Sequence, residues 1–217
     1  MADITFDVGR RERIGLSEAV LCEGKTGPQL TEALRLARAH GIPLLLTRLS
    51  VGLLDELAPA DREVIDYDPL SRTGIVGPWS APAGAAAVGI VTAGTSDLRV
   101  AREATRTLAF YGVAAREFAD VGVAGLWRIL RHEDELKTFP VLIVVAGMEG
   151  ALFSVVGGLV GGLVIAVPTS TGYGAARCGE TALSAGLASC APGIVMVNID
   201  NGYGGACAAL RVLHHLK

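Results

Sequence analysis

The second half of the chain repeats one unit, a short apolar run that ends in a cluster of glycines and small polar residues. The apolar runs cover residues 87–92, 141–146, 164–167 and 194–197. Apolar runs of this length that alternate with helical segments are typical of buried parallel strands. Open α/β sheets hold their ligands at the carboxyl ends of such strands, where these polar clusters fall. The pattern therefore predicts an α/β protein with a binding site along one edge of a sheet.

Composition and charge exclude several other classes of protein. The 217 residues are 51% hydrophobic and only 19% charged, which excludes a disordered chain. The net charge of −3 and the absence of a Lys/Arg cluster argue against nucleic-acid binding. The most apolar stretch, Pro140–Pro168, is interrupted by Glu149 and by glycines, so it suits buried strands and not a membrane-spanning helix.

The start of the chain and the cysteines predict a cytoplasmic protein. Residues 1–7 lack the basic region and apolar core of a secretory signal. The four cysteines, Cys22, Cys178, Cys190 and Cys207, show no Cys-x-x-Cys spacing. A disulfide framework is not expected in a chain of this size without a signal, so we expect free thiols.

A Pro- and Gly-rich stretch, residues 77–86, reads as a linker between two segments. We expect a small N-terminal α/β segment over residues 1–80 and a catalytic domain over residues 87–217. In the first segment the periodicity predicts helices over 29–39 and 53–60 and strands over 43–46 and 64–67.

After the linker, strands and helices alternate regularly. The expected strands cover 87–92, 113–118, 141–146, 163–167 and 194–199. The expected helices cover 96–111, 123–137, 151–160, 176–190 and 204–216. Five buried strands with helices between them predict a flavodoxin-like, doubly wound parallel sheet in a three-layer sandwich.

Two clusters carry charges beside the expected strands. Ser96 and Asp97 follow Gly94 and Thr95 at a strand-to-helix junction. They can cap the helix, or the same helix start can bind an anion. Glu149 lies between an apolar strand and an apolar helix, where we expect it to be partly buried and suited to proton transfer. The alternative is a solvated carboxylate at a helix start.

Other candidates are more ambiguous. Cys190 ends the expected helix 176–190, and a free cysteine there is most simply a small buried side chain. The clusters 168–174 and 198–204 can form turns or approach a ligand. None of the four histidines falls at the end of an expected strand.

Together, several stretches resemble one enzyme family, pyridinium-3,5-biscarboxylic acid mononucleotide synthase. They are residues 89–97, 120–126, 144–152, 166–175 and 189–193 followed by 197–202. A looser resemblance extends through residues 23–26, 47–48 and 67–73. The resemblance implies a catalytic domain related to aminoimidazole ribonucleotide (AIR) carboxylase. It implies that nicotinic acid adenine dinucleotide is carboxylated at ring C5 and cleaved to release AMP, which begins nickel-pincer nucleotide synthesis.

The resemblance also implies roles for particular residues. Cys190 would be the nucleophile that adds to ring C6, and Glu149 would be the nearby carboxylate for proton transfer. The residues expected to bind substrate are Gly94, Thr95, Ser96, Asp97, Gly147, Met148, Thr169, Ser170, Asn198 and Asp200. The chain departs from the family pattern at Trp127, where a more polar residue is expected, and at residues 177–180.

The implied chemistry uses carbon dioxide or bicarbonate as co-substrate. Phosphoanhydride cleavage favours a divalent cation, Mg²⁺, held through water and substrate oxygens, although no ligands are identified. A homo-oligomer is expected because related carboxylases form octamers. Two alternatives stay open: a purine-pathway AIR carboxylase or mutase, which would need a strand-end histidine, and a non-catalytic nucleotide-sensing domain, which would not need Cys190.

Overall fold

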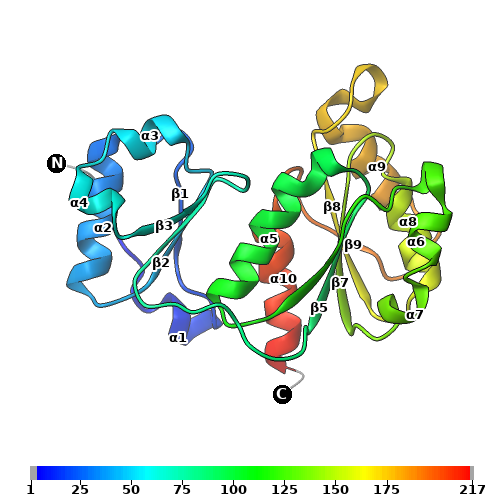
Figure 1. Ribbon diagram of the computed structural model, residues 1–217, viewed down its shortest axis with the longest axis horizontal. Coiled ribbons are helices and arrows are strands. Elements are labelled where there is room, and N and C mark those ends of the chain that lie inside the picture. The colour runs from blue at the N-terminus through cyan, green and yellow to red at the C-terminus, as the bar shows by residue number, and fades with distance from the viewer. Residues whose placement is uncertain (1–3, 216–217) are drawn as a thin grey trace. The chain divides into compact units, whose positions relative to one another are not determined.

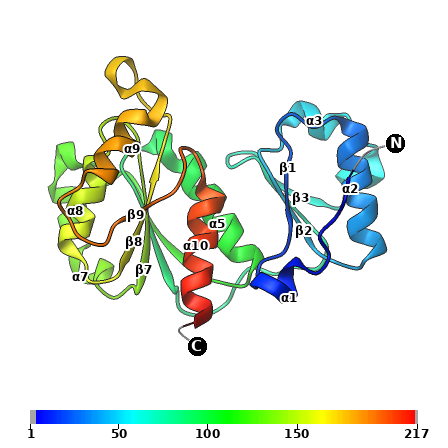
Figure 2. The same ribbon diagram turned by 180° about the vertical axis from the view of Figure 1, so that it is seen from behind.

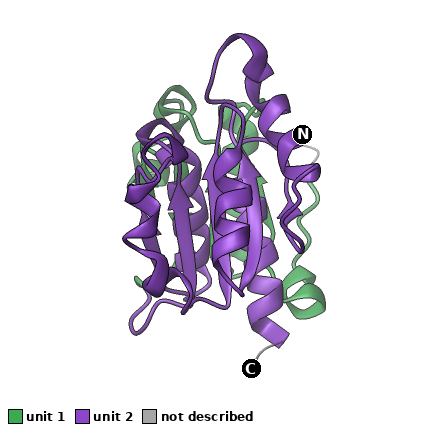
Figure 3. Cartoon of the chain, turned by 90° about the vertical axis from the view of Figure 1, so that its right-hand side faces the viewer, with its two compact units in different colours: residues 1–81 green, residues 82–217 purple. Residues whose placement is uncertain are grey.

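The computed structural model describes residues 4–215. It divides into two compact units, residues 1–81 and 82–217, coloured separately in Figure 3. Residues 77–87, which connect the last strand of the first unit to the first strand of the second, form neither helix nor strand. No helix within residues 4–215 combines the length and the apolarity that crossing a bilayer requires.

The first unit is a four-stranded mixed sheet with helices. Its strands are β1 (Ala19–Leu21), β2 (Leu44–Thr47), β3 (Ile65–Asp68) and β4 (Thr73–Val76), in the order β1-β2-β4-β3. β1 runs parallel to β2, whereas β4 is antiparallel to both of its neighbours. Helix α2 (Gly27–Ala39) buries Leu30, Ala33, Leu34 and Ala37, which recur at helical spacing, in the core of this unit.

The structure corrects several expectations for the first unit. The expected helix over 53–60 is two short helices, α3 (Val51–Asp55) and α4 (Pro59–Arg62), and the second begins with a proline. Proline suits the first turn of a helix but interrupts a helix that is already running. Helix α1 (Arg10–Ile14) and strands β1 and β4 were not predicted, since each is only three to five residues long.

The second unit confirms the predicted fold class. Its five strands are all parallel, in the order β6-β5-β7-β8-β9, which is the flavodoxin-like order. The strands are β5 (Val88–Thr92), β6 (Ala115–Phe118), β7 (Val141–Ala146), β8 (Leu163–Pro168) and β9 (Val195–Met196). β7 is central and every one of its residues is buried, which explains its continuous apolar sequence.

Helices cover both faces of this sheet. α5 (Leu98–Phe110) and α10 (Gly202–His215) lie on one face, and α8 (Ala151–Leu159) and α9 (Glu180–Leu187) lie on the other (Figures 1 and 2). A Cβ added at Gly205 would lie 2.8 Å from the Val167 side chain, so glycine lets α10 pack closely on the sheet. On the opposite face, Phe153 and Val156 of α8 join the core formed with Leu142 and Val144.

Two of the expected helices are broken. The span 123–137 contains a 3₁₀ turn, η2 (Val123–Gly125), followed by two one-turn helices, α6 (Trp127–Leu130) and α7 (Glu133–Leu136). The span 176–190 begins in an irregular 3₁₀ segment, η3 (Gly174–Gly179), and becomes α9 only at Glu180. Arg177 and Cys178 have left-handed φ values of 46° and 51°, which no α-helix accommodates.

Smaller boundary errors fall at the ends of other elements. The expected helix 96–111 begins at Leu98, after a 3₁₀ turn, η1 (Thr95–Asp97). The expected strand 194–199 retains only two residues, Val195 and Met196, and the chain then reaches Asp200, which has a left-handed φ of 54°. Residue 216, the last of the expected helix 204–216, lies outside the described residues.

Candidate active site

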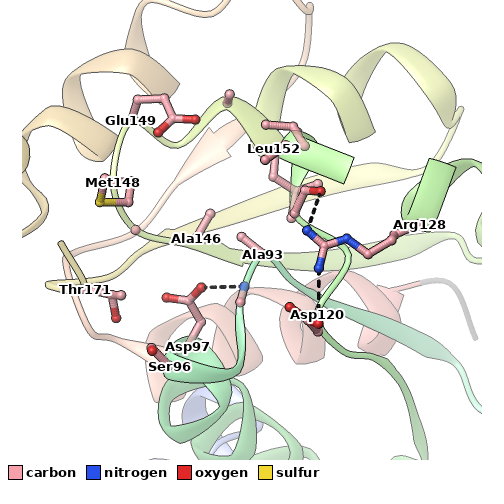
Figure 4. A pocket seen from close by; sticks show the side chains of 16 residues that line it. Ala93, Ser96, Asp97, Asp120, Arg128, Ala146, Met148, Glu149, Leu152 and Thr171 are labelled. Atoms are coloured by element: carbon pink, nitrogen blue, oxygen red, sulfur yellow. Dashed lines mark hydrogen bonds and ion pairs between the residues drawn. The ribbon is translucent and has the colours of Figure 1, made fainter. Parts of the chain in front are cut away.

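A cavity of about 410 Å³ opens at the carboxyl ends of β5, β6 and β7 (Figure 4). This is the edge at which open parallel sheets hold ligands. Three turns form its walls: the one after β5, the one after β6 and the one between β7 and α8. Its polar lining consists of Ser96, Asp97, Asp120, Arg128, Glu149 and Thr171.

The first wall is held in place by Asp97. This side chain is only 2% exposed. One of its carboxylate oxygens accepts a hydrogen bond from the Gly94 N–H at 2.9 Å, and the other accepts one from the Thr169 hydroxyl at 2.6 Å. Asp97 therefore ties the turn after β5 to the turn after β8 and leaves Ser96 exposed at the pocket.

The second wall is the tight turn between β7 and α8. The Met148 N–H donates to the Thr171 carbonyl at 2.8 Å. A Cβ added at Gly147 would lie 2.2 Å from that same carbonyl oxygen, so only glycine permits this close approach. Met148 and Gly150 have φ values of 51° and 65°, and between them the turn presents Glu149 to the pocket.

Glu149 is exposed, so the expectation that it is partly buried is wrong. The reason is local. The left-handed residues on either side turn the backbone at the end of the buried strand, and the carboxylate leaves the core. In Figure 4, Glu149 and Met148 lie across the pocket from Ser96 and Asp97. The carboxylate is thus free to face a ligand held between the two walls.

The third wall carries a charged pair that the sequence analysis did not single out. Arg128 of α6 contacts the Asp120 carboxylate at 3.1 Å, and a second guanidinium nitrogen donates to the Gly122 carbonyl at 3.4 Å. A Cβ added at Gly125 would lie 2.8 Å from Nε of Arg128, so glycine makes room for this side chain. The signal in the sequence was an arginine eight residues after a strand-end aspartate.

Several residues predicted to bind substrate do not line the cavity. They are Thr95, Thr169, Ser170, Asn198 and Asp200. The Ser170 N–H and hydroxyl both donate to the Asp200 carboxylate, at 3.0 and 2.6 Å. Burial alone would raise the pKa of Asp200, but the hydrogen bonds from Ser170 and the Arg99 guanidinium lower it overall. These side chains connect the turns after β8 and β9 to each other.

Cys190 lies in the loop that follows α9 and is exposed. The neighbouring Ser189 hydroxyl lies 2.7 Å from the Ser154 hydroxyl of α8, and Ala191 packs beside Gly157. The loop therefore runs along the middle of α8, as Figure 2 shows, whereas the cavity adjoins the first turn of that helix. Cys190 is not among the residues that line the cavity.

The other cysteines differ in their exposure to solvent. Burial raises the pKa of Cys22 to about 12 and that of Cys207 to about 11, so both are protonated thiols at neutral pH. Cys178 and Cys190 are both exposed. A thiolate and not a thiol is the nucleophile, so exposure restricts the candidates to these two.

Within residues 4–215, no group of three or more His, Cys, Asp or Glu side chains has the arrangement to hold a metal ion. Asp97 accepts one hydrogen bond on each carboxylate oxygen, and Asp120 is paired with Arg128. The polar groups of this cavity therefore do not form a metal centre of their own. The expected Mg²⁺ stays a prediction, and no residue of this chain is assigned to hold it.

Comparison with known proteins agrees with the architecture of both units. Residues 87–216 match the AIR carboxylase family, and residues 1–78 match the LarB/PurE-like N-terminal domain. The five-stranded unit with its strand-end cavity is thus a domain of the AIR carboxylase class. With both domains matched, the chain belongs to the LarB family, and the resemblance noted in the sequence is confirmed.

Two individual proteins illustrate the similarity. An uncharacterized protein of Methanocaldococcus jannaschii is 39% identical over 221 aligned positions, which cover 97% of this chain and 85% of that protein. A crystal structure of a Treponema denticola PurE2 variant shares 20% identity, with a TM-score of 0.49, over 60% of this chain and 80% of that one. The family matches support a carboxylase-type function for the second unit.

Proposed function

We propose that the protein carboxylates the pyridinium ring of nicotinic acid adenine dinucleotide at C5 and cleaves its phosphoanhydride to release AMP. The observation that carries this proposal is the cavity of the AIR carboxylase-type unit, where Glu149 faces the Arg128–Asp120 pair and the Ser96 turn. A carboxylate opposite an arginine provides a proton acceptor and an anion-binding group in one cavity.

The proposed reaction is covalent catalysis by a thiolate. The Cys190 sulfur forms a bond to C6 of the electron-poor pyridinium, and the ring electrons collect as an enamine that is nucleophilic at C5. C5 then forms a bond to carbon dioxide. Glu149 removes the proton from C5, the C6–S bond breaks, and the released thiolate and the restored aromatic ring complete the cycle.

Arg128 is the cation suited to hold the substrate. A guanidinium carries five N–H donors, and two of its nitrogens are engaged by Asp120 and Gly122. The remaining donors can bind a phosphate or carboxylate oxygen at the pocket. Because Asp120 and Gly122 already fix the side chain, little conformational entropy is lost when the anion binds.

For Cys190 to act in the cavity, its sulfur must be brought there from the loop that carries it. Its loop lies along the middle of α8, so the sulfur reaches a ring in the cavity either by movement of this loop or from the loop of a second copy. Mixing Glu149→Gln protein with Cys190→Ala protein distinguishes these routes. Recovered activity in mixed oligomers means that thiol and carboxylate come from different copies, and no recovery means that they come from the same copy.

The test of the proposed function is mass spectrometry after the protein is incubated with nicotinic acid adenine dinucleotide and ¹³C-bicarbonate. The expected products are AMP and a dicarboxylated pyridinium mononucleotide that carries one ¹³C. Glu149→Gln should slow carboxylation by about 10²- to 10⁴-fold, the usual contribution of a positioned general base. Unchanged substrate with the unmodified protein, or turnover of carboxyaminoimidazole ribonucleotide instead, would contradict the proposal.

A further inference from the structure

Trp127 is one of the most exposed large apolar residues of the second unit. Its side chain is 65% exposed, and it belongs to none of the buried clusters of this unit. Leu126, which precedes α6, and Leu130, which ends it, are also exposed, by 45% and 41%. An indole normally contributes a large apolar surface to a core or to an interface. Its exposure here therefore calls for a ligand or a partner.

Trp127 also adjoins the cavity along the chain, although it is not itself among the residues that line it. Val123 and Ala124, which precede Trp127 by four and three residues, both line the cavity, and so does the next residue, Arg128. The 3₁₀ turn η2 leads directly into the one-turn helix α6 through Leu126, whose backbone angles are helical. Side chains three and four residues apart share a helix face. Trp127 therefore continues the face of α6 that borders the cavity.

The chemistry of this face suits a flat heteroaromatic ring. The Arg131 guanidinium lies 5.6 Å from the centroid of the Trp127 ring, so a cation adjoins the indole. Stacking on aromatic side chains is the common way in which proteins hold exposed bases, and it tolerates different bases because each has a π-face. A phosphate attached to the base would lie near a cationic surface.

The substrate of the proposed function has two ring systems, and the cavity suits one. Its volume of about 410 Å³ lies near the lower end of the range of roughly 300–1,000 Å³ for small-molecule sites. The pyridinium must lie beside Glu149 to react, which leaves the purine outside. The purine half also departs as AMP, and an open rim permits that exchange.

We propose that Trp127, with Arg131 beside it, is the stacking platform for the purine base of the dinucleotide and of the AMP product. This inference rests on the proposed function for the identity of the substrate. It adds a specificity-determining residue that discriminates a dinucleotide from a mononucleotide.

The binding test uses the full chain with Trp79→Phe, which leaves Trp127 as the only tryptophan. AMP should quench or shift the Trp127 fluorescence in a saturable manner, whereas ribose 5-phosphate should not. Trp127→Phe keeps an aromatic face and is the matched control for Trp127→Ala. AMP that leaves the indole fluorescence unchanged at saturating concentration overturns the proposal, whether or not the protein proves to be a carboxylase.

The kinetic test compares the dinucleotide with nicotinic acid mononucleotide as the carboxylation substrate. Trp127→Ala should raise KM for the dinucleotide by about 5- to 150-fold, as loss of one base stack does, with kcat within about 2-fold. Its KM for the mononucleotide should not change, and Trp127→Phe should retain most of the dinucleotide affinity. Equal effects on both substrates, or a loss of oligomer mass in sedimentation with no selective effect on KM, would mean that a second copy covers this face and would overturn the proposal.

Discussion

The cavity walls and the loop that carries Cys190 differ in how they are held in place. The cavity walls are fixed by short hydrogen bonds between turns, such as Thr169 to Asp97 at 2.6 Å and Met148 to Thr171 at 2.8 Å. The Cys190 loop has an exposed thiol and no strand or helix between Leu187 and Val195, and it contacts α8 through the Ser154–Ser189 hydroxyl pair at 2.7 Å and the packing of Ala191 beside Gly157.

Under the proposed mechanism, this difference separates the group of residues that would bind the substrate from the residue that would attack it. A preorganised cavity holds its ligand without further ordering, so it contributes affinity and orientation. A nucleophile on an exposed loop contributes only when the loop is brought to the ring. Substitutions in the cavity walls should therefore lower stability and substrate affinity. Substitutions in the Cys190 loop should lower only the rate of the chemical step.

The largest expected effect comes from the loop. Cys190→Ala should lower carboxylation by at least about 10³-fold, because the proposed mechanism depends on this thiolate to activate the ring. Its thermal unfolding midpoint and its affinity for the dinucleotide should stay close to those of the unmodified protein, since the side chain is exposed and outside the cavity. Rapid-quench assays and calorimetric titration measure the two properties separately.

Cys178→Ala is the matched control for this substitution. Cys178 is the other exposed thiol, but it lies in η3 and does not line the cavity. It should retain full carboxylation. If Cys190→Ala retains turnover while Cys178→Ala loses it, the nucleophile has been assigned to the wrong cysteine.

The second-largest expected effect is a loss of folding stability caused by a substitution in the cavity wall. Gly147→Ala places a methyl group 2.2 Å from the Thr171 carbonyl oxygen, and the backbone on both sides must move. We expect the free energy of unfolding to fall by about 1–3 kcal/mol, the usual cost of overpacking a well-packed site. Urea denaturation measures this loss, and the affinity for the dinucleotide should fall with it.

Gly158→Ala provides the contrast within α8. A Cβ at Gly158 meets nothing within 4 Å. Alanine is favoured over glycine in a helix by about 0.5–1 kcal/mol, so this variant should be slightly more stable than the unmodified protein. Equal losses in the two variants would show that helix propensity, and not the close approach of the two turns, governs Gly147.

The sequence predicted the regular parts of the second unit because they follow simple periodicities. β7 has the predicted limits, 141–146, since a buried central strand is a continuous apolar run. The predictions of single helices over 123–137 and 176–190 were wrong, because backbone angles that depend on tertiary packing interrupt the helical periodicity there. The left-handed Arg177 and Cys178 are the clearest example, as nothing in their side chains favours that conformation.

The cavity could be predicted only in part. Ser96, Asp97 and Glu149 follow strands directly, so their place at the sheet edge comes from topology alone. Arg128 reaches the cavity from a one-turn helix inside a span that was read as one long helix, so no periodicity pointed to it. The direction of the hydroxyls of Thr169 and Ser170, toward Asp97 and Asp200, depends on which turns are neighbours, and a single sequence does not give that order.

The third prediction tests the buried carboxylate of the cavity wall. Asp97→Ala leaves the buried Thr169 hydroxyl and the Gly94 N–H without their acceptor. We expect a loss of about 1–3 kcal/mol of stability, the cost of unsatisfied buried donors. Ser96→Ala, one residue away and exposed, should change stability by less than about 0.5 kcal/mol. Urea midpoints that are equal for the two variants would contradict the role given to Asp97.

The smallest expected effect is a dependence of stability on pH at Asp200. Its pKa in the folded state lies below its ordinary value of 3.8, so the unfolded chain binds this proton more readily. The stabilisation is therefore complete above about pH 4 and is lost as the pH falls through the folded-state pKa. Urea unfolding of the unmodified protein and of Asp200→Asn, from about pH 6 down to pH 2.5, measures this difference. The two curves should converge at the acidic end, with Ser170→Ala between them because it loses one donor to the carboxylate. Curves that stay parallel over the whole range would mean that Ser170 and Arg99 do not lower the pKa of Asp200, and that the turns after β8 and β9 are held by other contacts.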